Sequence, residues 1–229
     1  MNNHIRNVLN TQIDYYESLF SKYGYSPESV GSENPVTKNI RYEQLSHMFH
    51  GDNNFSVHDV GHGLGHYYQY LRETFPEKNI SYSGSEVCPQ FTSFCKEHYP
   101  ECSFYLRNLA ENPLSEKYDY IVFGGTFYHI ENILEEDWKC FIELMIKNAY
   151  ISSTKAVSFN FITDYCDYYK PGLFYCKIDY ITDFIVKNLT RFFIIHHAYP
   201  LYEYTITIYH PDIVKEQYPE QEFRRYFKE

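Results

Sequence analysis

The stretch Phe55-Ser-Val-His-Asp-Val-Gly-His-Gly-Leu-Gly-His66 changes character half-way along its length. Its first half carries apolar side chains at Phe55, Val57 and Val60, which is typical of a buried strand. Three glycines follow at once, at the point where a strand has to turn. Beyond them apolar residues recur at helical spacing, at Leu64, Tyr67, Tyr68 and Leu71. The stretch therefore predicts a strand, a glycine-rich turn and a helix.

A second predicted strand, residues 80–85, ends in Glu86, about 21 residues after Gly65. A carboxylate at this place can accept both hydroxyl protons of a ribose. The glycines let a ligand approach the backbone closely, and the helix behind them offers unpaired N–H groups. Together these features predict a nucleoside-bearing ligand at the carboxyl edge of a parallel sheet.

The glycine pattern does not match the dinucleotide fingerprint G-x-G-x-x-G/A, whose third small residue lets helix and strand pack. Counted from Gly61, that third place is His66, and counted from Gly63 it is Tyr68. An NAD-dependent oxidoreductase is therefore the weaker interpretation, although it stays an alternative.

The observed pattern, D-V-G-x-G-x-G from Asp59, resembles motif I of class I S-adenosylmethionine-dependent methyltransferases. Tyr82-Ser-Gly-Ser-Glu86 resembles their second motif, and Tyr118-Asp-Tyr-Ile-Val-Phe-Gly-Gly-Thr126 resembles their fourth. Tyr199-Pro-Leu-Tyr-Glu-Tyr-Thr205 is similar to a last strand found in their small-molecule members. The resemblance covers roughly residues 40–210 and implies S-adenosylmethionine as cofactor, with S-adenosylhomocysteine as product.

Strands alternate with helices along the chain, which predicts a parallel sheet with helices on both faces. The expected strands are 55–60, 80–85, 102–107, 118–124, 156–162, 191–198 and 203–210, and the expected helices 64–75, 87–99, 134–150 and 178–189. Only Tyr199-Pro-Leu-Tyr202 joins the last two strands, too short a link for a parallel crossover. We therefore expect an α/β, doubly wound, mostly parallel seven-stranded sheet with an antiparallel last strand.

A predicted N-terminal helical cap, residues 1–50, precedes this core and consists of helices over 1–23 and 38–49. The Rossmann-like core occupies residues 51–210, and residues 211–229 form a C-terminal tail with the character of a frayed helix. At this length the three parts make one domain overall.

The resemblance implies a set of cofactor contacts. Glu86 holds the ribose, Val87 lies against the adenine, and Arg41 binds the methionine carboxylate. Asp59 fixes the loop or contacts the cofactor amine. Asn108 stands where the family often has an aspartate that accepts from the adenine amino group, and an amide oxygen can accept the same bond. The other implied contacts are Gly61, Gly63, Gly65, Leu109, through its backbone N–H, and Gly124.

Methyl transfer to a hydroxyl needs a group that takes the proton. His129 follows the fourth strand and is the first candidate base, because histidine titrates near neutrality; a structural histidine is the equal alternative. Tyr128 is expected beside the sulfonium or acceptor, since an aromatic face attracts a cation. Asp164, after the fifth strand, is an alternative base or a solvated loop residue.

The amino-acid composition limits the kinds of substrate and bound ion that are expected. The formal net charge of −10, without a lysine or arginine run, disfavours a nucleic-acid substrate. Six cysteines without a C-x-x-C pair argue against zinc, and we expect no metal. No signal peptide or membrane-spanning run is evident, so a cytoplasmic monomer or homodimer with reduced thiols is expected. The 26 tyrosines and 18 phenylalanines could line a substrate pocket, or reflect a compositional bias.

The leading functional prediction is methyl transfer to a hydroxyl of a small polar metabolite, such as a sugar, a surface-polysaccharide precursor or a secondary metabolite. By analogy the chain resembles bacterial tailoring enzymes. The alternatives are N-methylation of a small amine, an NAD-dependent oxidoreductase, or a cofactor-binding module whose active site has lapsed.

Overall fold

An eight-stranded mixed sheet forms the centre of the computed structural model, which describes residues 3–31, 34–49 and 51–227. Seven strands follow the order β3-β2-β1-β4-β5-β8-β7, and β6 pairs separately with β5. The strands are β1 Asn54–Val60, β2 Asn79–Glu86, β3 Ser103–Leu106, β4 Tyr118–Phe123, β5 Ser153–Thr163, β6 Tyr175–Cys176, β7 Phe193–His196 and β8 Glu203–Tyr209. The order reverses direction beside β1, where a crevice opens at the carboxyl ends of the strands.

The last strand is antiparallel, as predicted. β8 runs antiparallel to both β5 and β7, whereas β1 pairs parallel with β2 and β4, and β5 pairs parallel with β4. The predicted count of seven omits β6, which has only two residues. Two residues carry no alternation of polar and apolar side chains, so the sequence gives no period from which such a strand could be predicted.

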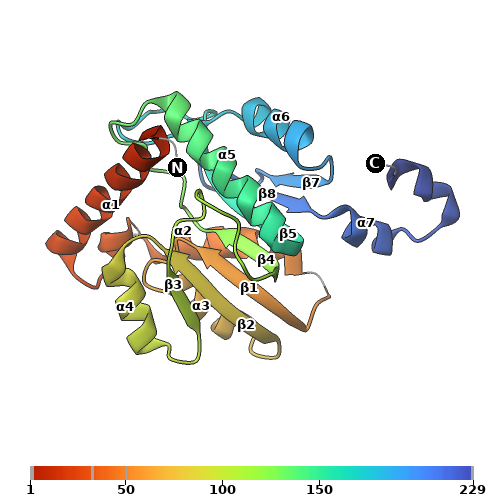
Figure 1. Ribbon diagram of the computed structural model, residues 1–229, viewed down its shortest axis with the longest axis horizontal. Coiled ribbons are helices and arrows are strands. Elements are labelled where there is room, and N and C mark those ends of the chain that lie inside the picture. Colours follow the sequence, from red (N-terminus) through yellow and green to blue (C-terminus); the bar gives the residue numbers. More distant parts are fainter. Residues whose placement is uncertain (1–2, 32–33, 50, 228–229) are drawn as a thin grey trace.

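Helices cover both faces of the sheet, as predicted (Figure 1). The α1, α5 and α6 helices pack on one face, and residues of α2, α3 and α4 join a second apolar cluster on the other. Their bounds are α1 Asn3–Tyr23, α2 Pro35–Ser46, α3 His66–Thr74, α4 Pro89–His98, α5 Glu135–Ser152, α6 Ile178–Asn188 and α7 Pro211–Gln217.

The central strand β4 shows why the sheet needs two helical layers. Ile121 and Phe123 belong to the cluster with α1, α5 and α6, whereas Tyr120 and Val122 belong to the cluster with α2 and α3. All four are buried. A strand that is apolar on both sides is stable only between two covering layers.

The α2 helix begins three residues earlier than predicted and ends sooner. Asn34 caps its N-terminus, because the Asn34 side-chain oxygen accepts the N–H of Val36 at 2.9 Å. Pro35 fits the first turn, where its missing N–H costs nothing. Residues 47–49 continue as a 3₁₀ turn.

The C-terminal tail projects from the body of the protein as α7 and a 3₁₀ turn over Gln221–Phe227 (Figure 1). Residues 1–2, 32–33, 50 and 228–229 of the predicted cap and tail lie outside the described residues. The division into cap, core and tail stays a prediction. None of the described helices has both the length and the apolar character required to cross a bilayer.

Candidate functional site

A cavity opens at the carboxyl edge of the sheet, beside the switch in strand order. It is lined by the loops that follow β1, β2, β3 and β4 and is covered by residues of α1 and α2. It encloses about 1220 Å³ of space between protein atoms, with its open mouth included. Ligands of open α/β sheets bind at this place.

The loop after β1 turns through three left-handed glycines. The φ angles of Gly61, Gly63 and Gly65 are 80°, 52° and 76°. A Cβ added to Gly65 would lie 2.7 Å from Cε2 of Tyr99, so a side chain there meets both strain and a clash. All three glycines were predicted as cofactor contacts, and Gly61 and Gly63 line the cavity. Gly65 instead starts α3 behind it, at the N-cap position.

Glu86 lies beneath this loop, where three backbone N–H groups hold its carboxylate. Gly63 donates to Oε2 at 3.1 Å, and Val87 and Cys88 donate to Oε1 at 2.6 and 3.1 Å. Burial raises the pKa of Glu86, and these three hydrogen bonds oppose the increase. The carboxylate therefore has one orientation, and Oε2 keeps room to accept a further hydrogen bond from a ligand.

Asp59 is buried behind the loop and is not among the residues that line the cavity. Its Oδ2 accepts the hydroxyl of Tyr82 at 2.6 Å. Burial raises the pKa of Asp59 to about 7, an effect that the Tyr82 hydrogen bond opposes. Of the two predicted roles, this position fits support of the loop rather than contact with a cofactor amine.

Val87 and Leu109, the predicted adenine contacts, both line the cavity. The side-chain oxygen of Asn108 is already engaged by the backbone, because Oδ1 accepts the N–H of Ala110 at 3.0 Å. The Asn108 Nδ2 is buried without a partner in the described structure. This amide is thus placed to donate, whereas the sequence-based expectation was an acceptor.

Arg107 also lines the cavity, although the sequence analysis did not single it out. Its Nε donates to the Ser85 hydroxyl at 2.8 Å, and its Nη1 donates to Glu116 at 3.0 Å. Its Nη2 is buried without a partner in the described structure. Arg107 stands one position before Asn108, and that adjacency was the available signal.

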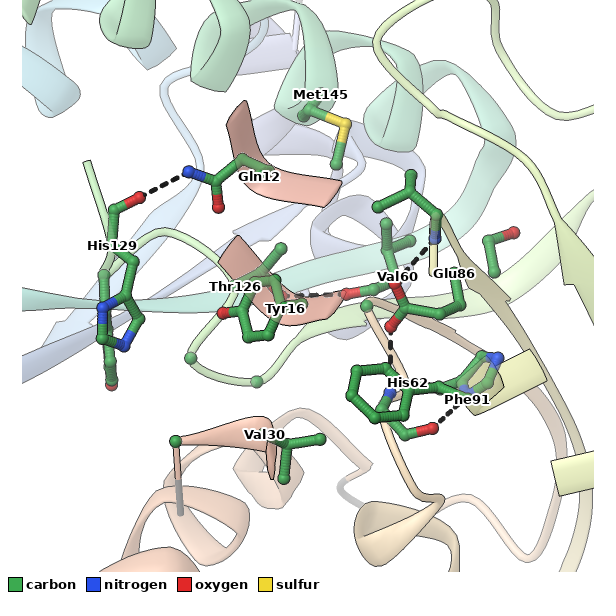
Figure 2. A pocket seen from close by; sticks show the side chains of 18 of the residues that line it. Gln12, Tyr16, Val30, Val60, His62, Glu86, Phe91, Thr126, His129 and Met145 are labelled. Atoms are coloured by element: carbon green, nitrogen blue, oxygen red, sulfur yellow. Dashed lines mark hydrogen bonds between the residues drawn. The ribbon is translucent and has the colours of Figure 1, made fainter. Parts of the chain in front are cut away.

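The loop after β4 crosses the middle of the cavity. Gly124, a predicted cofactor contact, lines it. The Thr126 hydroxyl connects the loop to β1 by donating to the Val60 carbonyl at 2.9 Å. Figure 2 shows Tyr16 of α1 between His129 on one side and Phe91 on the other. Tyr16 belongs to the predicted N-terminal cap and is a further alternative base, after Asp164 and Tyr128, if His129 does not take the proton.

His129 is the residue of the candidate base, and it lines the cavity. Its Nδ1 lies 3.7 Å from Oε1 of Glu131, and its ring packs on Tyr15 at 4.7 Å between centroids. Gln12 of α1 donates to the His129 carbonyl at 2.8 Å (Figure 2). Burial lowers the pKa of His129 to about 4, so the ring is neutral at pH 7. This differs from the sequence-based expectation of a histidine that titrates near neutrality.

Arg41 and Tyr128 belong to one buried network. Arg41 holds the Glu203 carboxylate in a bidentate pair, with distances of 2.7 to 2.9 Å. Tyr128 donates to Oε2 of the same carboxylate at 2.6 Å. The Asn160 amide donates to the Tyr128 hydroxyl oxygen and, at 3.1 Å, to Glu203 Oε2. The pKa of Tyr128 is raised well above its usual value by burial and by Glu203. Tyr128 therefore keeps its proton, and Arg41 is engaged by Glu203 rather than free for a ligand carboxylate.

Asp164 lies apart from these residues. It follows β5 directly and lines neither this cavity nor the wider one described next. The structure therefore does not bring the alternative base Asp164 together with His129 and Tyr128.

A second, wider cavity adjoins the first and encloses about 2190 Å³, with its open mouth included. The two cavities share Gly31, Arg41, Tyr128 and His129 as lining residues. A ligand in either cavity thus meets the same wall. Among the described residues, no group of three histidine, cysteine or acidic side chains could hold a metal ion.

Comparisons with known proteins identify the fold. No family model and no curated protein matches the sequence. The solved DhpI-SAM-HEP complex superimposes with a TM-score of 0.61 at 13% identity, covering 87% of this chain and 96% of that one. The N-methyltransferase NodS from Bradyrhizobium japonicum WM9, in complex with S-adenosylhomocysteine, gives 0.59 at 13% identity, with 86% and 98% covered.

Magnesium protoporphyrin IX methyltransferase from Synechocystis PCC 6803, with bound S-adenosylhomocysteine, gives a TM-score of 0.56 at 15% identity. The superposition covers 88% of this chain and 98% of that one. The chain therefore has the fold of class I S-adenosylmethionine-dependent methyltransferases, as the sequence motifs predict.

Proposed function

We propose that this protein transfers a methyl group from S-adenosylmethionine to a hydroxyl oxygen of a small molecule. The observation that carries the proposal is the arrangement of Gly61, Gly63 and Glu86 around one cavity at the switch in strand order. The fold shared with three methyltransferase structures supports it.

The residues present fit this cofactor. Glu86 has a fixed carboxylate with an acceptor position to spare, as ribose hydroxyls require. Arg107 and Asn108 each hold a buried N–H group without a partner among the described residues, and the neighbours Arg107 and Leu109 line the cavity. Such groups suit the ring nitrogens of adenine, which accept hydrogen bonds, because an unpaired buried donor is costly until a ligand satisfies it.

S-adenosylmethionine, when bound, supplies an electrophilic methyl group on a sulfonium. The chain has to hold the acceptor at close range and in line with that methyl, which alone lowers the barrier. Residues of α1 and α2 cover the cavity, so that they exclude water from the reacting atoms. Arg41, Tyr128 and His129 form the wall between the two cavities and thus lie where cofactor and acceptor would meet.

His129 takes the acceptor proton in this proposal. Its imidazole is neutral and can accept a proton, and Glu131 lies 3.7 Å from Nδ1 on the side away from Gly31. That carboxylate stabilises the imidazolium once it forms, in the manner of other histidine–carboxylate pairs. Catalytic hydrogen bonds are often long before the substrate binds, which is consistent with this separation. Tyr128 keeps its proton and orients Glu203 rather than acting as a base.

Calorimetry on cofactor-stripped protein tests the assignment. We expect S-adenosylhomocysteine to bind and NAD not to bind. NAD binding without any response to S-adenosylhomocysteine would contradict the proposal and favour an oxidoreductase.

A further inference from the structure

The second cavity is walled by tyrosines from three segments of the chain. Tyr15 and Tyr23 come from α1, Tyr168 and Tyr175 follow β5, and Tyr199 and Tyr202 precede β8. Pro171, Pro200, Leu173 and Leu201 fill the spaces between them. Three segments far apart in the sequence thus contribute the same residue type to one surface.

The hydroxyl groups of several of these tyrosines already have protein partners. Tyr175 accepts the N–H of Lys170 at 2.8 Å, Tyr199 shares a hydrogen bond with Thr205 at 3.1 Å, and Tyr202 donates to Asp167. The rings of Tyr168 and Tyr175 pack in turn against Tyr202 and Tyr169, at 5.9 and 4.6 Å between centroids. Since all six tyrosines line the cavity, they also present surface to a ligand there. The lining also contains polar side chains, among them Asn34, Thr37 and Lys170, which can pair with the hydroxyl groups of a ligand. Flat aromatic molecules gain from offset or edge-to-face contact with such rings as these tyrosines provide.

The charges around the cavity disfavour an anion near His129. The guanidinium of Arg41 is neutralised by its bidentate pair with Glu203. Glu131 lies beside His129 and has no lysine or arginine partner among the described residues. Glu28 adds a further carboxylate to the lining. Lys170, the remaining cation of the lining, stands over the Tyr168 ring at 5.9 Å. An acceptor with a carboxylate or phosphate would thus be repelled at the inner end.

We propose that the acceptor is a flat aromatic molecule, neutral or cationic, whose hydroxyl reaches His129 while its ring lies among the tyrosines of the second cavity. This inference rests on the proposed methyl transfer and narrows its substrate class. It departs from the sequence-based expectation of a sugar or another small polar metabolite. The residues that would make the ring contacts are Tyr15, Tyr168 and Tyr175, which line the second cavity.

Titration of protein saturated with S-adenosylhomocysteine tests the class of acceptor. The probes are naphthol, hydroxynaphthoate as its anionic counterpart, and methyl glucoside as a carbohydrate. Naphthol should bind with a Kd of about 1 mM or tighter. Hydroxynaphthoate and methyl glucoside should each bind at least about tenfold more weakly, a difference of about 1.4 kcal/mol. Equal or tighter binding of either one, or no binding of naphthol, would overturn the proposal.

Variants place the bound ring in the cavity. Tyr168→Leu should weaken naphthol binding about two- to tenfold, the range that one aromatic contact provides, and Tyr168→Phe should preserve it. Tyr218→Leu is the matched control, because Tyr218 is equally exposed, at 54%, and does not line the cavity. Identical behaviour of Tyr168→Leu and Tyr218→Leu would refute the assignment.

A parallel titration with S-adenosylhomocysteine alone separates the two proposals. If S-adenosylhomocysteine binds and naphthol does not, only the acceptor class is wrong. If S-adenosylhomocysteine itself does not bind, the methyltransferase proposal and the acceptor proposal fall together.

Discussion

Replacement of Glu86 by glutamine changes one atom at the point where the glycine loop and the proposed ribose site meet. The carboxylate accepts from Val87 and Cys88 at Oε1 and from Gly63 at Oε2. An amide can satisfy only one of these sides. With its oxygen toward Val87 and Cys88, its NH₂ group faces the N–H of Gly63, and two donors then oppose each other.

The expected loss follows from these contacts. A ribose hydroxyl that donates to a carboxylate makes a charge-assisted hydrogen bond worth about 1.5–3 kcal/mol. Glu86→Gln removes the charge and the open acceptor position of Oε2. The affinity for S-adenosylhomocysteine should therefore fall about 10- to 150-fold.

Calorimetry with S-adenosylhomocysteine measures this loss, and a thermal melt reports whether the fold survives. Glu77→Gln is the control, since Glu77 is exposed and lies two positions before β2. Burial raises the pKa of Glu86, so the wild-type affinity should decline on acidification sooner than for an exposed glutamate, whereas the variant should respond less. A folded variant whose affinity stays within about twofold of the wild type would refute the role of Glu86.

Three further perturbations test the loop, the base and the buried histidine. Gly63→Ala places a side chain at φ 52°, with its Cβ 3.0 Å from Val30, so it should lower the free energy of unfolding by about 1–2 kcal/mol and weaken S-adenosylhomocysteine binding. Gly24→Ala, at φ 62° in open space, should lower stability but leave binding unchanged. Equal affinities of the two variants for S-adenosylhomocysteine would contradict this. His129→Asn should reduce turnover of naphthol about 10²–10⁴-fold and leave cofactor binding intact. In the pH–rate profile of the wild type, the rate should fall off near pH 4 rather than near pH 6.5. Nearly full turnover by the variant would show that another group takes the proton. Burial lowers the pKa of His62 to about 4. Below about pH 6.5 this histidine is therefore protonated in the unfolded chain and still neutral in the folded protein. The free energy of unfolding should fall by up to about 3 kcal/mol as the pH decreases from about 6.5 to about 4. Urea titrations at both pH limits should show a smaller fall for His62→Gln, and parallel curves would argue against the buried neutral imidazole.

Local patterns were enough for the central elements. The strand, the glycine turn and the helix around Gly61–Gly65 depend on neighbouring residues, so their period and their glycines could be read directly. The antiparallel last strand followed from the short link before Glu203, because a parallel crossover needs more residues. Boundaries were less accurate, as at α2, where the Asn34–Pro35 cap starts the helix earlier than its apolar residues indicate.

Residues that act through distant partners could not be assigned in this way. Arg41 meets Glu203 across 162 positions, and Gln12 meets the His129 carbonyl across 117. Neither spacing repeats a local period, so no window of sequence contains both partners. The second cavity is likewise assembled from α1, the segment after β5 and the turn before β8.

The doubly wound sheet, the glycine loop and the acidic residue at the end of β2 could all be predicted from the sequence, because each depends on short-range periodicity and turn chemistry. Three features came from the packing of the chain: the Tyr82 hydroxyl donates to buried Asp59, Arg41 pairs with Glu203, and the His129 imidazole is neutral at pH 7. The physical reason is that burial and long-range pairing set the charge and orientation of a side chain, and both arise only when strands and helices from distant parts of the chain pack together.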